Sequence, residues 1–215
     1  MNNIVERFEK IKLNISKVEN NNAKIVAISK TFSLSHIMPL INHGHNHFGE
    51  NKVQEADHKW NDVKKKYKNL QLHMLGKLQT NKAKVAVKIF DYIHSLDNAK
   101  LASKISQFEK ELNKKVKLFI QVNIGDENQK SGIKIENLNN FYKKCVNDLD
   151  LNIVGLMCIP PFVQDTKPFF KKMKELSNEI NLPELSMGMS NDYLDSLKYS
   201  STYVRIGSKI FGNRG

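Results

Sequence analysis

Residues 24–32 read Lys-Ile-Val-Ala-Ile-Ser-Lys-Thr-Phe, a short apolar run followed by a lysine, Lys30. Four consecutive apolar residues, 25–28, are typical of a strand that is buried on both faces of a parallel sheet. We expect this strand to end near Ser29, which places Lys30 at its carboxyl end. In α/β proteins that end of the sheet carries the functional site, although a lysine there is more often an ordinary surface residue. The remainder of the chain decides between the two.

Seven further segments of strand length follow, and an amphipathic helical pattern separates each from the next. The expected strands are residues 25–29, 45–50, 70–76, 91–97, 117–123, 152–159, 184–189 and 202–207. The expected helices are residues 4–18, 33–44, 53–67, 80–88, 101–112, 135–148, 168–180 and 191–199. Strict alternation of this kind predicts a parallel sheet in an α/β protein.

Eight strand–helix units in about 200 residues predict a single (β/α)8 TIM-type barrel that spans residues 1–215 as one domain. The first helix precedes the first strand, so we expect this additional N-terminal helix to close the outer ring where no long helix follows the eighth strand. A doubly wound open sheet is the alternative. That fold normally has a glycine-rich loop after its first strand, and residues 29–35 contain no glycine.

The composition limits the possible partners and the compartment. The chain has 34 Lys+Arg against 22 Asp+Glu, a net charge of +12, but the lysines are scattered apart from short clusters at 64–66 and 171–172. A solvated lysine-rich surface therefore explains the charge better than a nucleic-acid patch does. Cys145 and Cys158 form no metal-binding or disulfide pattern. The chain has no apolar run of about 20 residues and its start does not resemble a signal peptide, so we expect a cytoplasmic protein with no membrane partner.

Two loops at the expected carboxyl rim carry the residue types of a phosphate site. Barrels often bind phosphate with the loops after strands seven and eight, and here these are residues 187–192 (MGMSND) and 205–212 (RIGSKIFG). A serine or glycine in such a loop is by itself usually a cap or a turn. Together with Lys30 they place a phosphate cradle and an amine on one rim. The lysine could be a charge partner or a nucleophile that forms a Schiff base, and pyridoxal 5′-phosphate (PLP) has both a phosphate and an aldehyde.

The motifs, in order, resemble those of the YggS/PROSC-type PLP homeostasis proteins. They are residues 29–31 (SKT), 47–55 (HFGENKVQE), 73–82 (HMLGKLQTNK), 94–97 (HSLD), 121–132 (QVNIGDENQKSG), 155–161 (GLMCIPP), 185–193 (LSMGMSNDY) and 201–214 (STYVRIGSKIFGNR). The resemblance runs from about Lys24 to Arg214 and implies the fold of the N-terminal barrel of alanine racemase. One position departs from the family pattern: Lys77 stands where histidine is more usual. Its amine could either alter the electrostatic field at the rim or simply face solvent.

The resemblance also implies the residues that hold the cofactor. It maps the Schiff-base lysine to Lys30, puts Ser190, Gly207 and Ser208 at the phosphate, Arg205 near the pyridine nitrogen and Asn51 close to the cofactor. It implies a monomer that binds PLP, supplies it to PLP-dependent apo-enzymes and has no established turnover. An arginine at the ring nitrogen fits that role, because it stays protonated and leaves the nitrogen unprotonated.

Two other functions remain open. A PLP-dependent amino-acid racemase needs an acid/base group on each face of the substrate carbon. In the racemases that share this barrel a second, β-rich domain supplies one of them, and we expect that domain to be absent because the sequence stops at Gly215. A nucleic-acid-binding protein rests on the charge of +12 alone and would show steeply salt-dependent binding.

Histidines outside the expected site are interpreted as structural. His43, His45 and His47 alternate in a possible metal-binding pattern, but they lie at the amino end of strand two and no carboxylate or cysteine accompanies them. We therefore expect no metal. His73 and His94 fall within strands three and four, where interior or rim positions are expected.

Overall fold

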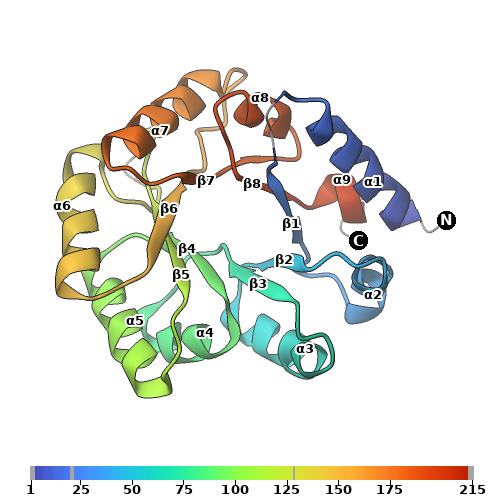
Figure 1. The fold of residues 1–215 in the computed structure, drawn as a ribbon, viewed down its shortest axis with the longest axis horizontal. Coiled ribbons are helices and arrows are strands. Elements are labelled where there is room, and N and C mark those ends of the chain that lie inside the picture. Colours follow the sequence, from blue (N-terminus) through green and yellow to red (C-terminus); the bar gives the residue numbers. More distant parts are fainter. Residues whose placement is uncertain (1–2, 20–21, 128, 213–215) are drawn as a thin grey trace.

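The computed structural model describes residues 3–19, 22–127 and 129–212, and within them eight parallel strands close into a barrel. Each strand pairs with its neighbours in chain order, and β8 pairs with β1. The strands are β1 (Lys24–Ile28), β2 (His47–Glu50), β3 (Gln71–Met74), β4 (Tyr92–Leu96), β5 (Lys117–Gln121), β6 (Ile153–Met157), β7 (Glu184–Met189) and β8 (Tyr203–Ile206). The predicted (β/α)8 barrel is confirmed (Figure 1). The two ends of the expected domain, and Asn213 and Arg214 of the last motif, lie outside the described residues.

Helices surround the barrel and cover the outer face of the strands (Figure 1). They are α1 (Asn3–Ser16), α2 (Leu34–Asn42), α3 (Val53–Lys66), α4 (Ala83–Ile89), α5 (Ala99–Leu112), α6 (Leu138–Lys143), α7 (Lys167–Glu179), α8 (Tyr193–Leu197) and α9 (Ser208–Phe211). Short 3-10 turns, Thr80–Lys82 and Ile135–Asn137, precede α4 and α6. None of the described helices is long and apolar enough to cross a lipid bilayer.

The N-terminal helix fills the gap that the sequence predicts in the outer ring. In Figure 1, α1 lies beside the short α9, between α8 and α2. Its apolar positions recur at steps of three and four, as in Ile4, Phe8, Ile11 and Ile15, and all four are buried. Burying a side chain of this kind contributes about 1.5–3 kcal/mol, so the stripe is sufficient to hold α1 against the barrel.

The strands separate two packed regions. The larger core lies between the barrel and its helices, while the barrel interior holds a second cluster of Val26, Tyr92, Phe119, Met157 and Tyr203. Histidine side chains share this interior with the aromatic rings, in contact with Tyr92 and Tyr203. The interior of the barrel is therefore filled with side chains.

Two local expectations differ from the structure. The predicted helix 135–148 is a 3-10 turn, α6 and a π-helical segment, Lys144–Asp148. The predicted helix 191–199 is only α8, with Asp192 as its N-cap residue.

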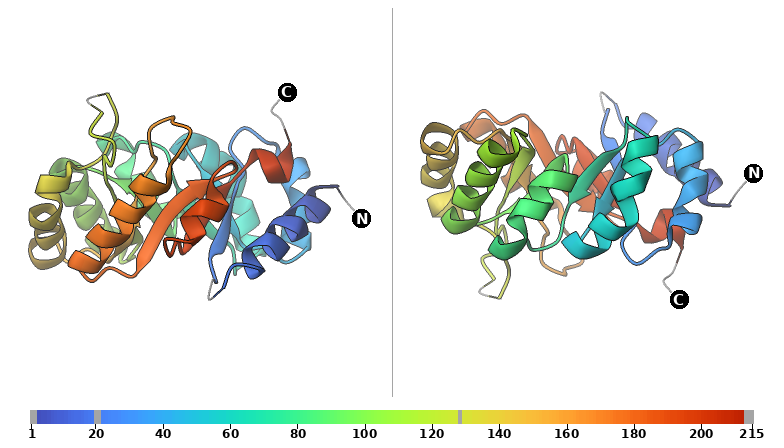
Figure 2. Two further views of the ribbon diagram at one scale, coloured as in Figure 1. Left: turned by 90° about the horizontal axis from the view of Figure 1, so that it is seen from above. Right: turned by 90° about the horizontal axis from the view of Figure 1, so that it is seen from below.

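The loops after β5 and β6 rise from the same side of the barrel, as the edge-on view in Figure 2 shows in yellow-green and orange. This side is the carboxyl end of every strand, because the strands are parallel. The loops after β1, β7 and β8 also leave the barrel there. All of the segments singled out for the site thus meet at one rim.

Candidate cofactor site

A cavity of about 900 Å³ opens at the carboxyl rim of the barrel. Five of the six residues predicted for cofactor binding line it: Lys30, Ser190, Arg205, Gly207 and Ser208. Its charged lining residues among those described are three cations, Lys30, Lys130 and Arg205, and two carboxylates, Asp192 and Asp195. The excess of positive charge suits an anionic ligand.

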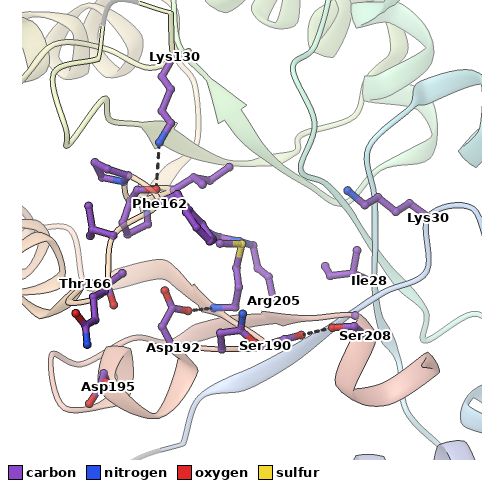
Figure 3. Close-up of a pocket in the computed structure, with 18 of the residues that line it drawn as sticks. Ile28, Lys30, Lys130, Phe162, Thr166, Ser190, Asp192, Asp195, Arg205 and Ser208 are labelled. Atoms are coloured by element: carbon purple, nitrogen blue, oxygen red, sulfur yellow. Dashed lines mark hydrogen bonds between the residues drawn. The ribbon is translucent and has the colours of Figure 1, made fainter. Parts of the chain in front are cut away.

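Lys30 reaches into the cavity from the end of β1, opposite the loops after β7 and β8 (Figure 3). The residues on either side of it are held by side chains of β2 and α3. Ser29 is buried; its hydroxyl donates to Glu50 Oε1 at 2.8 Å, and its carbonyl accepts from Lys59 Nζ at 3.0 Å. The backbone N–H of Thr31 donates to Glu55 Oε1 at 2.6 Å. The backbone on both sides of Lys30 is therefore anchored to β2 and α3.

These anchors form one charged network, which we call the Lys30 clamp: Ser29, Thr31, Glu50, Glu55 and Lys59. Lys59 Nζ lies 3.0 Å from Glu50 Oε1 and 3.1 Å from Glu55 Oε1. The indole N–H of Trp60 also donates to Glu50 Oε1, at 2.9 Å, so the fully buried Glu50 has several donors. A buried carboxylate is tolerated only when it is paired in this way.

Glu55 is ionised in the clamp. Partial burial raises the pKa of this carboxyl, but the hydrogen bonds from Thr31 and Lys59 outweigh that effect, and the pKa lies below its usual range. Thr31 itself has a φ of 68°, the left-handed region that a β-branched residue rarely occupies. The bond to Glu55 offsets the cost of that conformation and turns the chain at Lys30.

Arg205 is buried at the base of the cavity with neutral partners. Its guanidinium donates to the carbonyl and hydroxyl oxygens of Ser186, at 2.5 and 2.8 Å, and to the carbonyl of Cys158 at 2.7 Å. Burial lowers the pKa of Arg205, while Cys158 and Asp192 act in the opposite direction. No carboxylate lies within ion-pair distance of Arg205 among the described residues. A buried cation that faces a cavity without a paired anion suits an electron-rich or anionic ligand atom.

The loops after β7 and β8 come together at Ser190 and Ser208. The Ser208 hydroxyl donates to Ser190 Oγ at 3.2 Å, so both hydroxyls face one part of the cavity (Figure 3). The register of β7 against β8 shifts between Ser186 and Met189, which adds a residue to β7 before the rim. Gly188 lies in this irregularity with a φ of 87°, and a Cβ there would meet Ser196 Oγ at 2.1 Å. The glycine is therefore required for packing on α8, and it does not line the cavity.

Asn51 does not line the cavity, and the predicted contact with a cofactor stays a prediction. Its Oδ1 is buried and accepts no hydrogen bond from the described residues. A buried oxygen without a donor costs about 1–3 kcal/mol, which a ligand or a water could relieve. Lys77, the departure from the family pattern, is exposed and also lies outside the cavity lining.

Sequence reasoning missed the wall formed by the loops after β5 and β6. Ile159, Phe162 and Val163 form an exposed apolar lip. Lys130 brings a second amine, which donates to the Pro160 carbonyl at 3.2 Å and pairs with Glu127 at 2.5 Å. Two sequence signals could have found them: each follows a predicted strand at its carboxyl end, and Lys130 and Ile159 lie within the family motifs 121–132 and 155–161.

The histidine-rich segment 43–47 leads into β2. His45 and His47 lie at the amino end of the barrel, opposite the cavity, as expected. Nowhere in residues 3–19, 22–127 and 129–212 do three histidine, cysteine, aspartate or glutamate side chains gather in a way that could hold a metal ion.

Comparison with known proteins identifies the family to which this chain belongs. The model of the alanine racemase N-terminal domain matches residues 6–215. A pyridoxal phosphate homeostasis protein of Aquifex aeolicus is 35% identical over 223 aligned positions, which cover 100% of this chain and 96% of that protein. The chain belongs to the family of pyridoxal phosphate homeostasis proteins. The Haemophilus influenzae member is 37% identical, with 92% of this chain and 89% of that protein covered.

A solved structure agrees with the family assignment. PipY of Synechococcus elongatus, in the structure described as having PLP bound, is 32% identical with a TM-score of 0.87, and the match covers 97% of this chain and all of PipY. An alanine racemase of Corynebacterium glutamicum is only 16% identical, with a TM-score of 0.74 over 96% of this chain and 59% of the racemase. That likeness shows the shared barrel alone.

Proposed function

We propose that the chain binds PLP covalently through Lys30 and serves in intracellular PLP homeostasis. One observation carries the proposal: the amine of Lys30 and the hydroxyl pair of Ser190 and Ser208 open onto the same cavity. PLP, when bound, supplies an aldehyde that an amine can attack and a ring that can stabilise adjacent negative charge. The naming of relatives as PLP homeostasis proteins and the PLP-bound structure of PipY support the same cofactor.

The residues present fit this cofactor. Ser190 and Ser208 offer hydroxyl donors for a phosphate, with Gly207 between β8 and α9 leaving room beside them. Arg205 offers a buried guanidinium that can donate an N–H to the ring nitrogen. Asn51, with its orphaned Oδ1, is the remaining group assigned to the cofactor.

We further propose that the protein stores and hands over PLP and does not turn substrates over. Relatives 31–37% identical to the chain are named as homeostasis proteins. An arginine does not transfer a proton to the ring nitrogen at neutral pH, so the ring remains a weak electron sink. PLP-dependent apo-enzymes are the recipients in this proposal, and the donor acts as a monomer.

Reduction with borohydride tests the covalent bond. Protein loaded with PLP, treated with borohydride and digested, is expected to carry the reduced pyridoxyl group on the peptide that contains Lys30. Lys77→Ala is the matched control, because Lys77 is exposed and lies outside the cavity, and it is expected to label normally. Label on another lysine of the cavity, Lys130 in particular, would overturn the assignment.

A further inference from the structure

A continuous row of hydrogen-bonded side chains runs through the barrel interior and ends at Arg205. His47 Nδ1 lies 2.9 Å from His73 Nε2, and His73 Nδ1 lies 2.9 Å from His94 Nε2. His94 Nδ1 lies 2.8 Å from Ser186 Oγ, which accepts from Arg205 at 2.8 Å. The row crosses from β2 through β3 and β4 to β7 and β8, strands far apart in the sequence.

The three imidazoles are neutral. Burial lowers the pKa of His73 and of His94 well below the usual value; the neighbouring histidines and Lys24 add to the effect at His73, and Arg205 adds to it at His94. Burial, then Lys24 and Lys117, lower the pKa of His47 to about 4, against a small opposite effect of Asp91.

The rings around the row are aromatic. Tyr92 stacks on His73, Phe119 stacks on His94, and Tyr203 contacts all three histidines. None of these side chains can supply a counter-ion. A charged imidazole inside the barrel would therefore be strongly unfavourable.

The donor at one end sets the direction of the whole row. A neutral imidazole has one donor nitrogen and one acceptor nitrogen, whereas arginine only donates. Ser186 Oγ accepts from Arg205, so its own hydrogen is available for His94 Nδ1. If His94 Nδ1 instead carried the proton and donated to Ser186 Oγ, the buried hydroxyl hydrogen of Ser186 would have no acceptor among the described residues. Leaving it without an acceptor would cost about 1–3 kcal/mol.

With Nδ1 of His94 as an acceptor, its Nε2 carries the proton and donates to His73 Nδ1. The same reasoning makes His73 Nε2 the donor to His47 Nδ1. His47 is only half-buried, so its Nε2–H lies where water can accept it. The row thus needs all three histidines, because each fully buried Nε2–H must find the next acceptor until the chain of bonds reaches the amino end of the barrel.

We propose that His94, with His73 and His47 behind it, is a positioning residue that holds Arg205 against the ring nitrogen of the cofactor. The histidines form one polarised hydrogen-bond chain, all three protonated on Nε2. The chain keeps the Ser186 hydroxyl turned away from Arg205, so that its lone pair faces the guanidinium. This inference rests on the proposed PLP binding for its purpose, but the order of the protons is a property of the PLP-free protein.

The first test uses the PLP-free full-length protein with 15N-labelled histidine. Nitrogen–proton correlation spectra distinguish a protonated from an unprotonated ring nitrogen. We expect His47, His73 and His94 to show protonated Nε2 and unprotonated Nδ1 near neutral pH. A proton on Nδ1 of His94 would overturn the proposal, and because the measurement is made on the wild type, no folding defect of a variant can obscure it.

The second test asks whether the chain acts at the ring nitrogen. Binding of PLP is compared with that of an analogue in which a CH group replaces the ring nitrogen. Ser186→Ala removes the link between Arg205 and His94, and it is expected to reduce the preference for PLP over the analogue by roughly tenfold. Ser106→Ala, on α5, removes the bond from a buried serine to the Leu149 carbonyl. It is the matched control and is expected to keep the preference.

The outcomes separate this inference from the proposed function. A wild type that binds neither compound contradicts the proposed function. An unchanged preference in Ser186→Ala, with PLP still bound, contradicts the positioning role of the histidine chain. If the histidine chain has a purely structural role, Ser186→Ala will lower the affinities for PLP and for the analogue equally. That result would also overturn the positioning role.

Discussion

The backbone N–H of Thr31 donates to Glu55 Oε1 at 2.6 Å, a bond that ties the residue after Lys30 to the first turn of α3. Thr31 adopts a φ of 68° at this point. On the other side of Lys30, Ser29 is bonded to Glu50 and Lys59. The backbone on both sides of Lys30 is thus anchored by a clamp built from β2 and α3.

Glu55→Ala is expected to slow formation of the Schiff base by roughly 10- to 100-fold, because a misplaced amine attacks poorly. Affinity for pyridoxine 5′-phosphate, which has no aldehyde, should stay near that of the wild type, since the phosphate loops are untouched. Stopped-flow absorbance measures the first quantity and calorimetry the second. Glu111→Ala, which breaks an exposed pair with Lys84, is the control. If the rate of Schiff-base formation and the affinity for pyridoxine 5′-phosphate fell by the same factor, the clamp would have no specific role in positioning Lys30.

Lys30→Ala is expected to abolish the absorbance of the Schiff base while the barrel still folds. Lys30 is half-buried and belongs to the turn after β1, so it contributes little to the core. Weak non-covalent binding of PLP should survive, because Ser190 and Ser208 remain. Circular dichroism and visible absorbance, recorded on the same sample, check both parts. A normal Schiff-base band in the variant would identify another lysine as the attachment point.

Ser190→Ala and Ser208→Ala are each expected to weaken PLP binding by about tenfold or more and pyridoxal binding far less. Each removes a hydrogen bond to a charged phosphate, worth roughly 1.5–3 kcal/mol. Titration with the two compounds gives the comparison. The mutual bond of the two serines at 3.2 Å suggests that the double variant loses less than the sum. If both compounds lost affinity equally, the hydroxyls would have only a structural role.

The free energy of unfolding is expected to fall as the pH falls from about 6.5 to about 4. Burial, the largest cause, lowers the pKa of His45 and of His47 to about 4 in the folded protein. Between that value and the usual 6.5 the unfolded chain binds more protons, so stability rises with pH, by at most about 1.4 kcal/mol per unit for each proton. Urea unfolding across this range measures the slope. His45→Gln should reduce it and the exposed His58→Gln should not; a slope of zero in the wild type would contradict the neutral histidines.

No racemisation, transamination or decarboxylation with multiple turnovers is expected from the PLP-loaded protein alone. Arg205 keeps the ring nitrogen unprotonated in our proposal, which weakens stabilisation of a carbanion. Racemisation also needs an acid/base group on each face of the substrate carbon. The lack of one of them would lower the rate by a further 10²–10⁴-fold, about 3–5 kcal/mol of barrier. Incubation with each standard amino acid, followed by chiral and keto-acid analysis, tests this. Sustained turnover that disappears in Lys30→Ala would favour a racemase-like enzyme.

The amino-acid sequence by itself determined the barrel and the rim. Alternation of short apolar runs with helical stripes is a local property, and the parallel direction of the strands follows from it because each strand must cross over to the next through a helix. The number of units and the absence of a glycine-rich loop after the first strand then favoured a closed barrel over an open sheet. The same reasoning placed Lys30 and the two serine-containing loops at one end. Their carboxyl-end positions depend only on strand direction.

Tertiary structure alone decided how these residues are held. The Lys30 clamp joins residue 31 to residue 55, and the histidine chain joins residue 94 to residue 186. The wall formed by the loops after β5 and β6 also depends on the closed barrel. Side-chain hydrogen bonds between distant strands depend on the register of the strands and on the direction of each side chain inside the closed barrel. The periodicity of the sequence predicts neither of these.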